Sequence, residues 1–521
     1  MTHVWFYPDK VSAKPDETVR LFASASTSPC LLTVSRVGRS VEKVAEFKDI
    51  AVGNHPTPDN ADANGCGWPE AFNFKIGHDW ATGYYDIALS LPSGEVCHHF
   101  VVVRKADQAP KAKAAIIIST NTYFSYNYWG GANSYAHVDD LMAGKLTPED
   151  ARAAAIGSLS RMRPLAQGMF APPLNSPRLI NYTRRAKDEM ALPGDVDWMA
   201  KHQPSPYDGS AGYLQKWEHR FSEWMEAHNF SVDYLCDHDF ETEDPIASDY
   251  KVVLLVGHSE YWSGKQRAAL DRFVDTGGKL IIFSGNTCYW KVRWEDDGQT
   301  LIAHKARGET NDPLWEDPDT RADATHYWSH EAFDSPEARL TGLSFIYGGY
   351  HRLCACVARG AAAYTIYNDT HWALEDTDLY YGDLLGTDVP LIGYENDGCP
   401  LTFGEDGLPK PAGGVGVPNN LEIIGVAPAT LGEDPRSPYP PLIPPEDMDT
   451  CARLAYGATN DVTKQRLMRG HAVMASFKRG EGEVFNGGTT EWAHGLAAKD
   501  AFLEKITLNV FARFGLHADT T

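Results

Sequence analysis

The sequence predicts an α/β fold, in which a mostly parallel sheet with helices on both faces follows an N-terminal β-sandwich. Two observations lead to this prediction. Residues 1–107 contain short alternating runs such as "TVRLFASAS" and "HHFVVVR" between Gly, Pro and Asp turns, a pattern typical of an immunoglobulin-like sandwich. From residue 114 onward, uninterrupted apolar runs alternate with amphipathic segments. That alternation is typical of a parallel sheet buried on both faces.

A chain of 521 residues is too long for one hydrophobic core, so at least two domains are expected. The predicted boundary is "QAPKAKA" (108–114), a short basic segment with Ala and Pro. It separates the sandwich (1–107) from an α/β catalytic domain (114–521). Within the second domain, residues 291–470 loosen into Gly-, Pro- and Asp-rich segments with short β runs. We interpret them as long insertions.

The elements of the second domain can be read in order along the chain. "AAIIIST" (114–120) predicts the first strand, and residues 213–230 place apolar side chains at helical spacing. A strand and turn "VDYLCDHDF", the strand "KVVLLVG", the glycine-terminated helix "SGKQRAALDRFVDTGG" and the strand "KLIIFSGN" follow. The chain is predicted to close with two strands in "AVMASFKRGEGEVFNGGTTEW" and one helix in "AAKDAFLEKITLNVFARFG".

The charge balance argues against several classes of partner. There are 47 basic and 70 acidic residues, a net charge of −23, which disfavours nucleic acid and anionic membranes as partners. No apolar stretch approaches the roughly 18 to 20 residues of a membrane span. The start "MTHVWFYPDK" lacks a signal-peptide pattern, and nine scattered cysteines do not suggest a disulfide framework. We therefore expect a reduced, cytoplasmic protein.

Four polar clusters follow predicted strands. They are "STNTYFSYNYWGG", "GHSEYWS", "SGNTCYW" and "NGGTTEW". Ligands of open α/β sheets bind beyond the carboxyl ends of the strands, so these clusters are expected to face one crevice.

The familiar catalytic and metal-binding motifs are missing from the sequence. No G-x-S-x-G or G-x-C-x-G turn is present, so Ser259 and Cys288 lack the elbow that exposes a nucleophile. There is also no H-E-x-x-H, C-x-x-C or Walker loop. The segments "CHHF" and "HYWSHE" could bind a metal, but isolated histidine pairs of this kind are more often surface residues.

Glu260 is the most unusual polar residue of these clusters. A carboxylate that directly follows a buried strand in the sequence would lose its hydration, which is costly unless a cation pairs with it. The loop at 121–135 supplies Tyr123, Tyr126, Tyr128 and Tyr135. Carboxylate and phenolate oxygens form a hard donor set that suits ferric iron. Simple aromatic packing of the tyrosines is the competing interpretation.

The segment "GHSEYWSGKQRAALDRFVDTGGKLIIFSGNTCYW" resembles N,N-dimethylformamidase large subunits, which run H-P-E-Y-W, a helix, G-G-R-L, a strand and G-G-N-G-x-Y-W. "WMEAHNFSVDYLCDHDF", "NTYFSYN" and "GGTTEWAHGL" are similar to further segments of that family. The sandwich also resembles the domain before the family's catalytic domain. The resemblance covers most of the chain and implies a class I glutamine-amidotransferase-like architecture.

The resemblance implies a mononuclear iron, Fe³⁺, that is held by two tyrosines and one glutamate and hydrolyses a small amide. By position, Glu260 is the carboxylate ligand, and His258 and Asn286 are its active-site partners. Tyr126 is the implied first tyrosine ligand, with Tyr123 as the alternative.

The second tyrosine ligand is implied near "PRLINYTRRAKDE". There Tyr182 stands a few positions early, and the family's R-P-K-Y motif is missing. The resemblance also suggests a homo-oligomer, with a small accessory subunit as a further partner.

These residues suggest a mechanism in which the iron acts as a Lewis acid and activates water. His258 would move a proton to the leaving amine, and Asn286 would hydrogen-bond the developing oxyanion. Aromatic residues are expected to pack the substrate pocket: Tyr261, Trp262 and Trp290. Two rivals remain: a metal-free amidotransferase-like hydrolase that uses Ser259 or Cys288, and a non-enzymatic carbohydrate- or ligand-binding protein.

Overall fold

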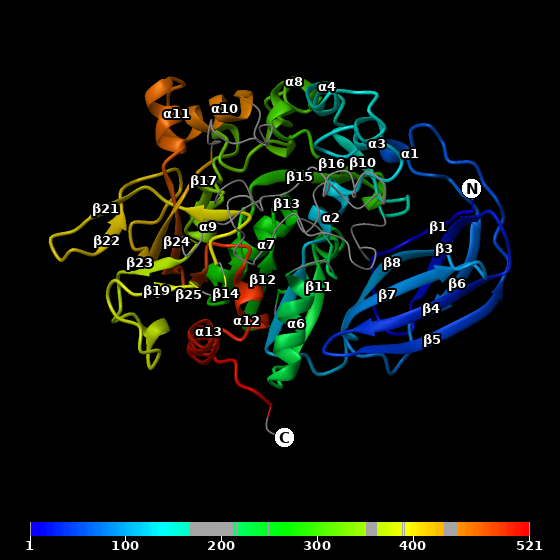
Figure 1. Ribbon diagram of the computed structural model, residues 1–521, viewed down its shortest axis with the longest axis horizontal. Helices are drawn as coiled ribbons and strands as arrows, with labels where there is room; N and C mark the ends of the chain where they lie inside the picture. Colours follow the sequence, from blue (N-terminus) through cyan, green and yellow to red (C-terminus); the bar gives the residue numbers. More distant parts are fainter. Residues whose placement is uncertain are drawn as a thin grey trace, which may run out of the picture.

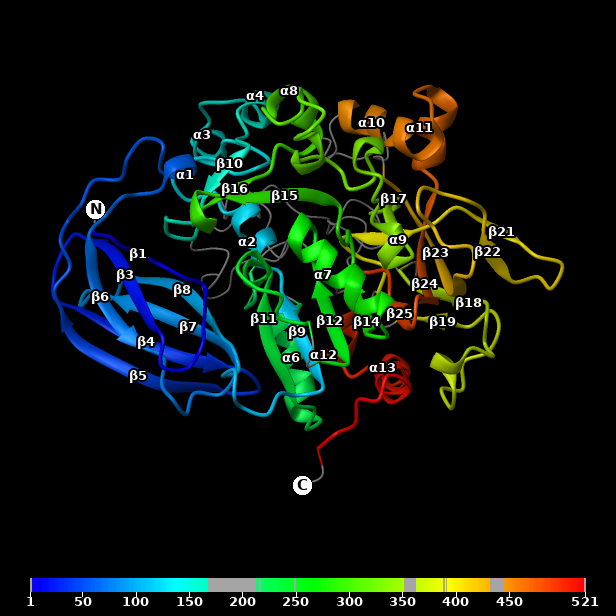
Figure 2. The same cartoon turned by 180° about the vertical axis from the view of Figure 1, so that it is seen from behind.

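The computed structural model describes residues 2–519, except 167–211, 215–216, 248–249, 351–361, 388, 390 and 432–444. A two-sheet unit built from the first hundred residues lies at one end of the molecule (Figure 1). A larger unit, built around a central sheet, forms the rest (Figure 2).

The N-terminal unit consists of two sheets that share one apolar core. One sheet has the order β1-β3-β6 and the other β2-β8-β7-β4-β5. Alternating side chains of both sheets fill the space between them, among them Phe6, Leu32 and Val101. The strands are β1 (Val4–Pro8), β2 (Ser12–Ala13), β3 (Thr18–Ala25), β4 (Cys30–Val37), β5 (Val41–Ile50), β6 (Glu70–Lys75), β7 (Gly83–Ser90) and β8 (Val96–Val103).

The central sheet has nine strands in the order β11-β9-β12-β14-β25-β24-β23-β18-β19. The first five run parallel to one another, and every pairing from β25 to β19 is antiparallel. The strands are β9 (Ala114–Ile118), β11 (Val232–Cys236), β12 (Val252–Gly257), β14 (Lys279–Ser284), β18 (Tyr364–Ile366), β19 (Leu384–Leu385), β23 (Glu422–Ala429), β24 (Gly470–Arg479) and β25 (Gly482–Asn486).

The predicted fold class, a mostly parallel α/β sheet with helices on both faces, is wrong. The described part of the chain is mostly β, and its sheets are mixed or antiparallel. A strand buried on both faces is continuously apolar whichever way its neighbour runs, so the apolar runs did not reveal direction. Only Gly480 and Glu481 separate β24 from β25, and so short a connection forces an antiparallel pair. Strands β18, β19 and β23 come from the 291–470 segment, which was interpreted as insertions.

The parallel strands present different side chains to their two faces. Ile116, Leu254 and Phe283 belong to the larger core cluster, and Ile117, Leu255 and Ile282 to another. Helices α6 (Glu218–Ala227) and α12 (Trp492–Ala497) pack on β12, with α13 (Ala501–Arg513) beside α12, whereas α7 (Gly264–Asp275) packs on β14 and β25. Figures 1 and 2 show α6 and α7 on opposite sides of the sheet.

A layer of short elements covers the carboxyl ends of the parallel strands (Figure 2). Its helices and turns include α2 (Thr120–Tyr126), α3 (Val138–Met142), α4 (Pro148–Ala153), η2 (Asp237–Glu241), η4 (Lys305–Arg307) and α8 (Gly308–Asn311). Its strands are β10 (Ser158–Ser160), β13 (Tyr261–Ser263), β15 (Trp290–Glu295) and β16 (Thr300–Ile302). Residues 121–126, which were expected to belong to a loop, are therefore helical.

The remaining elements lie at several places around the central sheet; α1 (Ala61–Asn64), for example, packs on β10. The other helices and turns are η3 (Asp296–Gly298), η5 (Arg321–Asp323), η6 (Glu331–Phe333), α9 (Ala338–Thr341), η8 (Trp372–Leu374), α10 (Pro445–Tyr456) and α11 (Asp461–Leu467). The strands are β17 (Ser344–Gly349), β20 (Asn396–Gly398), β21 (Leu401–Phe403) and β22 (Pro409–Pro411). Within the described residues, no helix combines the length and apolar character needed to cross a membrane.

Candidate active site

Glu260 lies just beyond the carboxyl end of β12, in the loop that the sequence singled out. The strand ends at Gly257, whose φ of 77° is a left-handed conformation that favours glycine. A Cβ at this position would also collide with Trp217. This turn carries the chain from the sheet into the site, where the Glu260 side chain is 2% exposed.

Two phenols meet the Glu260 carboxylate. Tyr126 Oη, from the last turn of α2, lies 3.2 Å from Oε2, and Tyr135 Oη lies 3.0 Å from Oε1 and 3.3 Å from Oε2. The Asn133 amide positions both tyrosines, because it donates to the Tyr126 carbonyl at 3.0 Å and accepts from the Tyr135 N–H at 2.9 Å. Tyr261 Oη is 2.6 Å from Tyr135 Oη. Burial, with the Glu260 charge as a further cause, raises the pKa of both Tyr126 and Tyr135 well above the usual value.

His258 lies between two carboxylates. Its Nε2 is 3.2 Å from Glu260 Oε2 and 2.5 Å from Glu395 Oε2, and all three side chains are buried. Burial by itself would lower the pKa of His258, but Glu395 and Glu260 outweigh it and raise that pKa well above its ordinary value. Burial raises the pKa of Glu395 in turn, against the opposing effect of His258. The arrangement is therefore suited to holding and moving a proton at Nε2.

Glu395 was not predicted from the sequence. It stands immediately before β20, inside the 291–470 segment. The "NGGTTEW" cluster holds it in place, because the Thr490 N–H donates to the Glu395 carbonyl at 3.1 Å. Gly285 from the "SGNTCYW" cluster lies so close to that carbonyl that a Cβ would not fit. The only sign of Glu395 in the sequence is that an acidic residue stands in "GYENDG", a segment that resembles many surface loops.

Asn286 occupies a left-handed turn after β14, with φ of 54°. Its N–H donates to Asp397 Oδ1 at 2.8 Å, and the Thr287 N–H donates to Oδ2 at 3.2 Å. The Asn286 side chain is 2% exposed, and its Oδ1 has no hydrogen-bond partner in the described part of the chain. A buried amide oxygen of this kind lacks the partner that such groups normally have.

Lys305 brings a cation to the site that the sequence did not suggest. Its Nζ lies 3.0 Å from the centre of the Tyr135 ring and 5.1 Å from that of Trp290. Burial lowers the pKa of Lys305 to about 7, against the opposing charge of Glu260. The residue also has a left-handed φ of 59°, a conformation that costs energy in a residue other than Gly, Asn or Asp.

Several predicted site residues are not brought to Glu260. The Tyr123 hydroxyl donates instead to Glu218. Trp262 belongs to the core on the α7 side of the sheet, where its Nε1 donates to the Ser259 carbonyl and hydroxyl. Trp290 contacts Lys305 rather than the carboxylate. Tyr182 lies outside the residues that the structure describes.

The structure offers little support for a nucleophilic serine or cysteine. Ser259 is buried, and its Oγ accepts from Trp262 Nε1 at 2.9 Å. Cys288 is buried against Arg267 at 3.6 Å, and burial raises the pKa of its thiol. In the described residues, neither side chain is hydrogen-bonded to a histidine, as an activated nucleophile would be.

The donors around Glu260 fit a hard cation. Two phenol oxygens lie within hydrogen-bond distance of one carboxylate. Tyr126 and Glu260 are buried, and Tyr135 is partly buried. Oxygen donors of this type suit ferric iron, which would deprotonate the phenols despite their burial. The residues present therefore fit the iron that the resemblance implied.

A family described as N,N-dimethylformamidase beta subunit-like, C-terminal, matches residues 32–505. The chain belongs to this family. Membership confirms the resemblance suggested by the "GHSEYW" and "SGNTCYW" segments. No curated protein matches the chain.

Two solved structures show short local similarities to this chain. One is Spo0M, a sporulation control protein from Bacillus subtilis, with 13% identity over 20% of this chain and 49% of that chain, and a TM-score of 0.15. Another is Escherichia coli alpha-2-macroglobulin activated by porcine elastase, with 12% identity over 22% and 10% of the two chains, and a TM-score of 0.14. The chain thus spans about half of the first protein and a tenth of the second.

Proposed function

We propose that this protein hydrolyses the C–N bond of a small amide with a mononuclear Fe³⁺ held by Glu260 and two tyrosines. The observation that carries the proposal is the contact of the Glu260 carboxylate with the hydroxyls of Tyr126 and Tyr135, beside His258. Tyr135 thereby supplies a second phenol among the described residues, so the donor set does not depend on Tyr182.

When bound, the iron supplies a Lewis acid for the amide carbonyl and lowers the pKa of a water. His258 then holds a proton at Nε2 and passes it to the nitrogen of the leaving amine. Glu395, at 2.5 Å, fixes the imidazole and stabilises its charged form. Asn286 orients the substrate through its side-chain amide, and its otherwise unpartnered Oδ1 accepts an N–H of a primary or secondary amide.

The colour of the protein tests the ligand set. Ferric iron bound by phenolate gives a charge-transfer band in the visible region, so the iron-loaded protein should be coloured. Tyr126→Phe and Tyr135→Phe remove one donor oxygen each but keep the ring, and each should shift or bleach the band. Tyr123→Phe is the matched control, because its hydroxyl faces Glu218. A colourless protein with about one iron per chain would refute phenolate ligation.

Metal analysis and turnover separate the roles of the polar residues. Glu260→Gln replaces an anionic donor by a neutral one and should lose iron. His258→Ala should keep iron and lower turnover of small amides by roughly 10²- to 10⁴-fold, as expected for a proton-transfer group. The reverse pattern would invert the assignment.

A further inference from the structure

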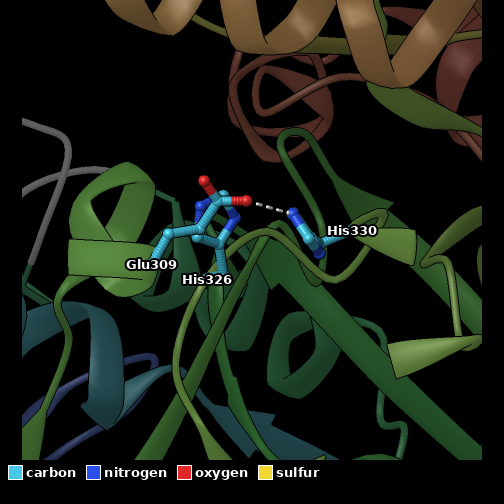
Figure 3. Close-up of side chains that lie close together, drawn as sticks. All are labelled: Glu309, His326 and His330. Atoms are coloured by element: carbon cyan, nitrogen blue, oxygen red, sulfur yellow. Dashed lines mark hydrogen bonds and ion pairs between the residues drawn. The ribbon is translucent and has the colours of Figure 1, made fainter. Parts of the chain in front are cut away.

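A second group of potential metal ligands lies apart from Glu260. Glu309 from α8 and two histidines of the following loop, His326 and His330, place one ligand atom each within 4.8 Å of one another (Figure 3). The sequence favoured surface histidines for "HYWSHE", but His326 is 1% exposed and His330 is 4% exposed. Glu309 is open to solvent, so an ion can reach the group.

The protein backbone holds this group together without a metal. Gly308 brings α8 so close to the next segment that a Cβ would overlap the Thr325 carbonyl oxygen. Asp312, at the end of α8, accepts from the Thr325 N–H at 2.8 Å and from its hydroxyl at 2.9 Å. These contacts fix Glu309 and His326 relative to each other, which reduces the entropy that a ligand must overcome.

One of the imidazoles has an unpartnered nitrogen. His326 Nδ1 is buried and makes no hydrogen bond of normal geometry in the described part of the chain, although the Ala306 backbone lies close enough to the ring to oppose the lowering of its pKa by burial. Buried polar atoms normally have a partner, and an exception points to an ion or water. In Figure 3 a dashed line joins the Glu309 carboxylate to His330, and the His326 ring overlaps that carboxylate in this view.

Two interactions compete with a metal ion at this place. His330 Nδ1 accepts from the Ala332 N–H at 3.1 Å, so Nε2 carries the proton that Glu309 Oε1 accepts at 2.9 Å. Arg453 lies 3.6 Å from Glu309 and 3.5 Å from His330 Nε2. A metal at His330 Nε2 would replace that proton. The ring proton would then sit on Nδ1, so the hydrogen bond from the Ala332 N–H in the three-residue turn would be lost. Arg453 would keep its ion pair with Glu331.

We propose that Glu309, His326 and His330 form a binding site for a Zn²⁺ ion, separate from the iron site. Two imidazole nitrogens and one carboxylate are a known zinc ligand set, and the exposed side leaves the fourth position to water. The ion ties α8 to the loop at 326–330. Lys305, which contacts Tyr135, begins the turn before α8, and Tyr327 packs on Trp290 at 4.2 Å. The zinc would thus stabilise the wall of the active site rather than take part in the reaction.

Zinc binding to tag-free, metal-depleted protein tests the proposal. Zn²⁺ is titrated against a chromophoric chelator, in wild type and in a Glu260→Gln background that removes the iron site. We expect about one Zn²⁺ per chain in both, with Glu309→Gln weakening binding by roughly 100-fold or more. Glu295→Gln is the matched control, because Glu295 and Glu309 are both 46% exposed. Arg453→Gln removes a competing cation and should tighten binding several-fold.

Thermal unfolding provides a second measurement. Zn²⁺ should raise the unfolding midpoint of wild type and of Glu295→Gln, but not that of Glu309→Gln, because only a ligand of the folded state stabilises it. Equal zinc affinity in Glu309→Gln and Glu295→Gln would overturn the proposal. Failure of wild type to bind zinc would also overturn it, and would leave the group as an ion-pair network around Arg453. Neither result would bear on the iron site.

Discussion

Replacement of Asp397 by Asn should change how the stability of the protein depends on pH. Asp397 is fully buried and accepts the N–H groups of Asn286 and Thr287. Burial raises the pKa of its carboxyl from 3.8 to about 7. Because the folded pKa is raised, this group's contribution to stability is fully present below about pH 4 and is lost as the pH rises through 7.

The size of the effect follows from the two pKa values. Between pH 5 and pH 8, a group with pKa 3.8 unfolded and about 7 folded costs the folded state about 2.5 kcal/mol. Asp397→Asn lacks this titration. It keeps an oxygen for one N–H but turns an NH₂ group toward the other, which should cost about 1–3 kcal/mol at low pH. The variant should therefore be about 1–3 kcal/mol less stable than wild type at pH 5, and this difference should fall by about 2.5 kcal/mol at pH 8, where the variant is between about 0.5 kcal/mol less stable and about 1.5 kcal/mol more stable.

Denaturant unfolding at pH 5 and pH 8 measures the difference in free energy of unfolding between wild type and variant. Asp312→Asn is the matched control. Burial by itself would raise the pKa of Asp312, but hydrogen bonds from Arg293 and the Thr325 N–H outweigh burial and hold that pKa below its usual value. This carboxylate stabilises the fold above about pH 4, so the control should be destabilised equally at both pH values. A pH-independent difference for Asp397→Asn would refute a protonated, buried carboxyl at this turn.

Three further predictions concern the site and the core. Glu395→Gln keeps the shape of the side chain but removes the charge beside His258; turnover should fall by roughly 10²- to 10⁴-fold while iron content, measured by metal analysis, stays unchanged. Lys305→Met should keep the iron but shift the charge-transfer band, because a cation 3.0 Å from the Tyr135 ring is lost; an identical spectrum would contradict this contact. Trp492→Ala should lower the free energy of unfolding by about 3–5 kcal/mol, because the indole is fully buried, stacks on Phe283 at 4.5 Å and donates to Thr507.

The sequence by itself indicated the buried strands and the polar segments at their carboxyl ends. A continuous apolar run followed by "GHSEYW" indicated a buried strand with polar groups at its carboxyl end, and Glu260 and His258 lie there. The strand could be predicted because a strand that is buried on both faces is apolar at every consecutive position. The same rule indicated β9 and β14, which flank β12.

Only the tertiary structure decided which side chains meet. Glu395 reaches His258 from a segment more than a hundred residues away, and nothing in "GYENDG" records that contact. Tyr135 rather than Tyr123 faces Glu260, because the turn of α2 and the loop after it set their directions. Sheet direction was equally hidden, since apolar strands pack alike in parallel and antiparallel pairs. Local sequence encodes burial and turns, whereas contacts between distant segments depend on how the whole chain packs.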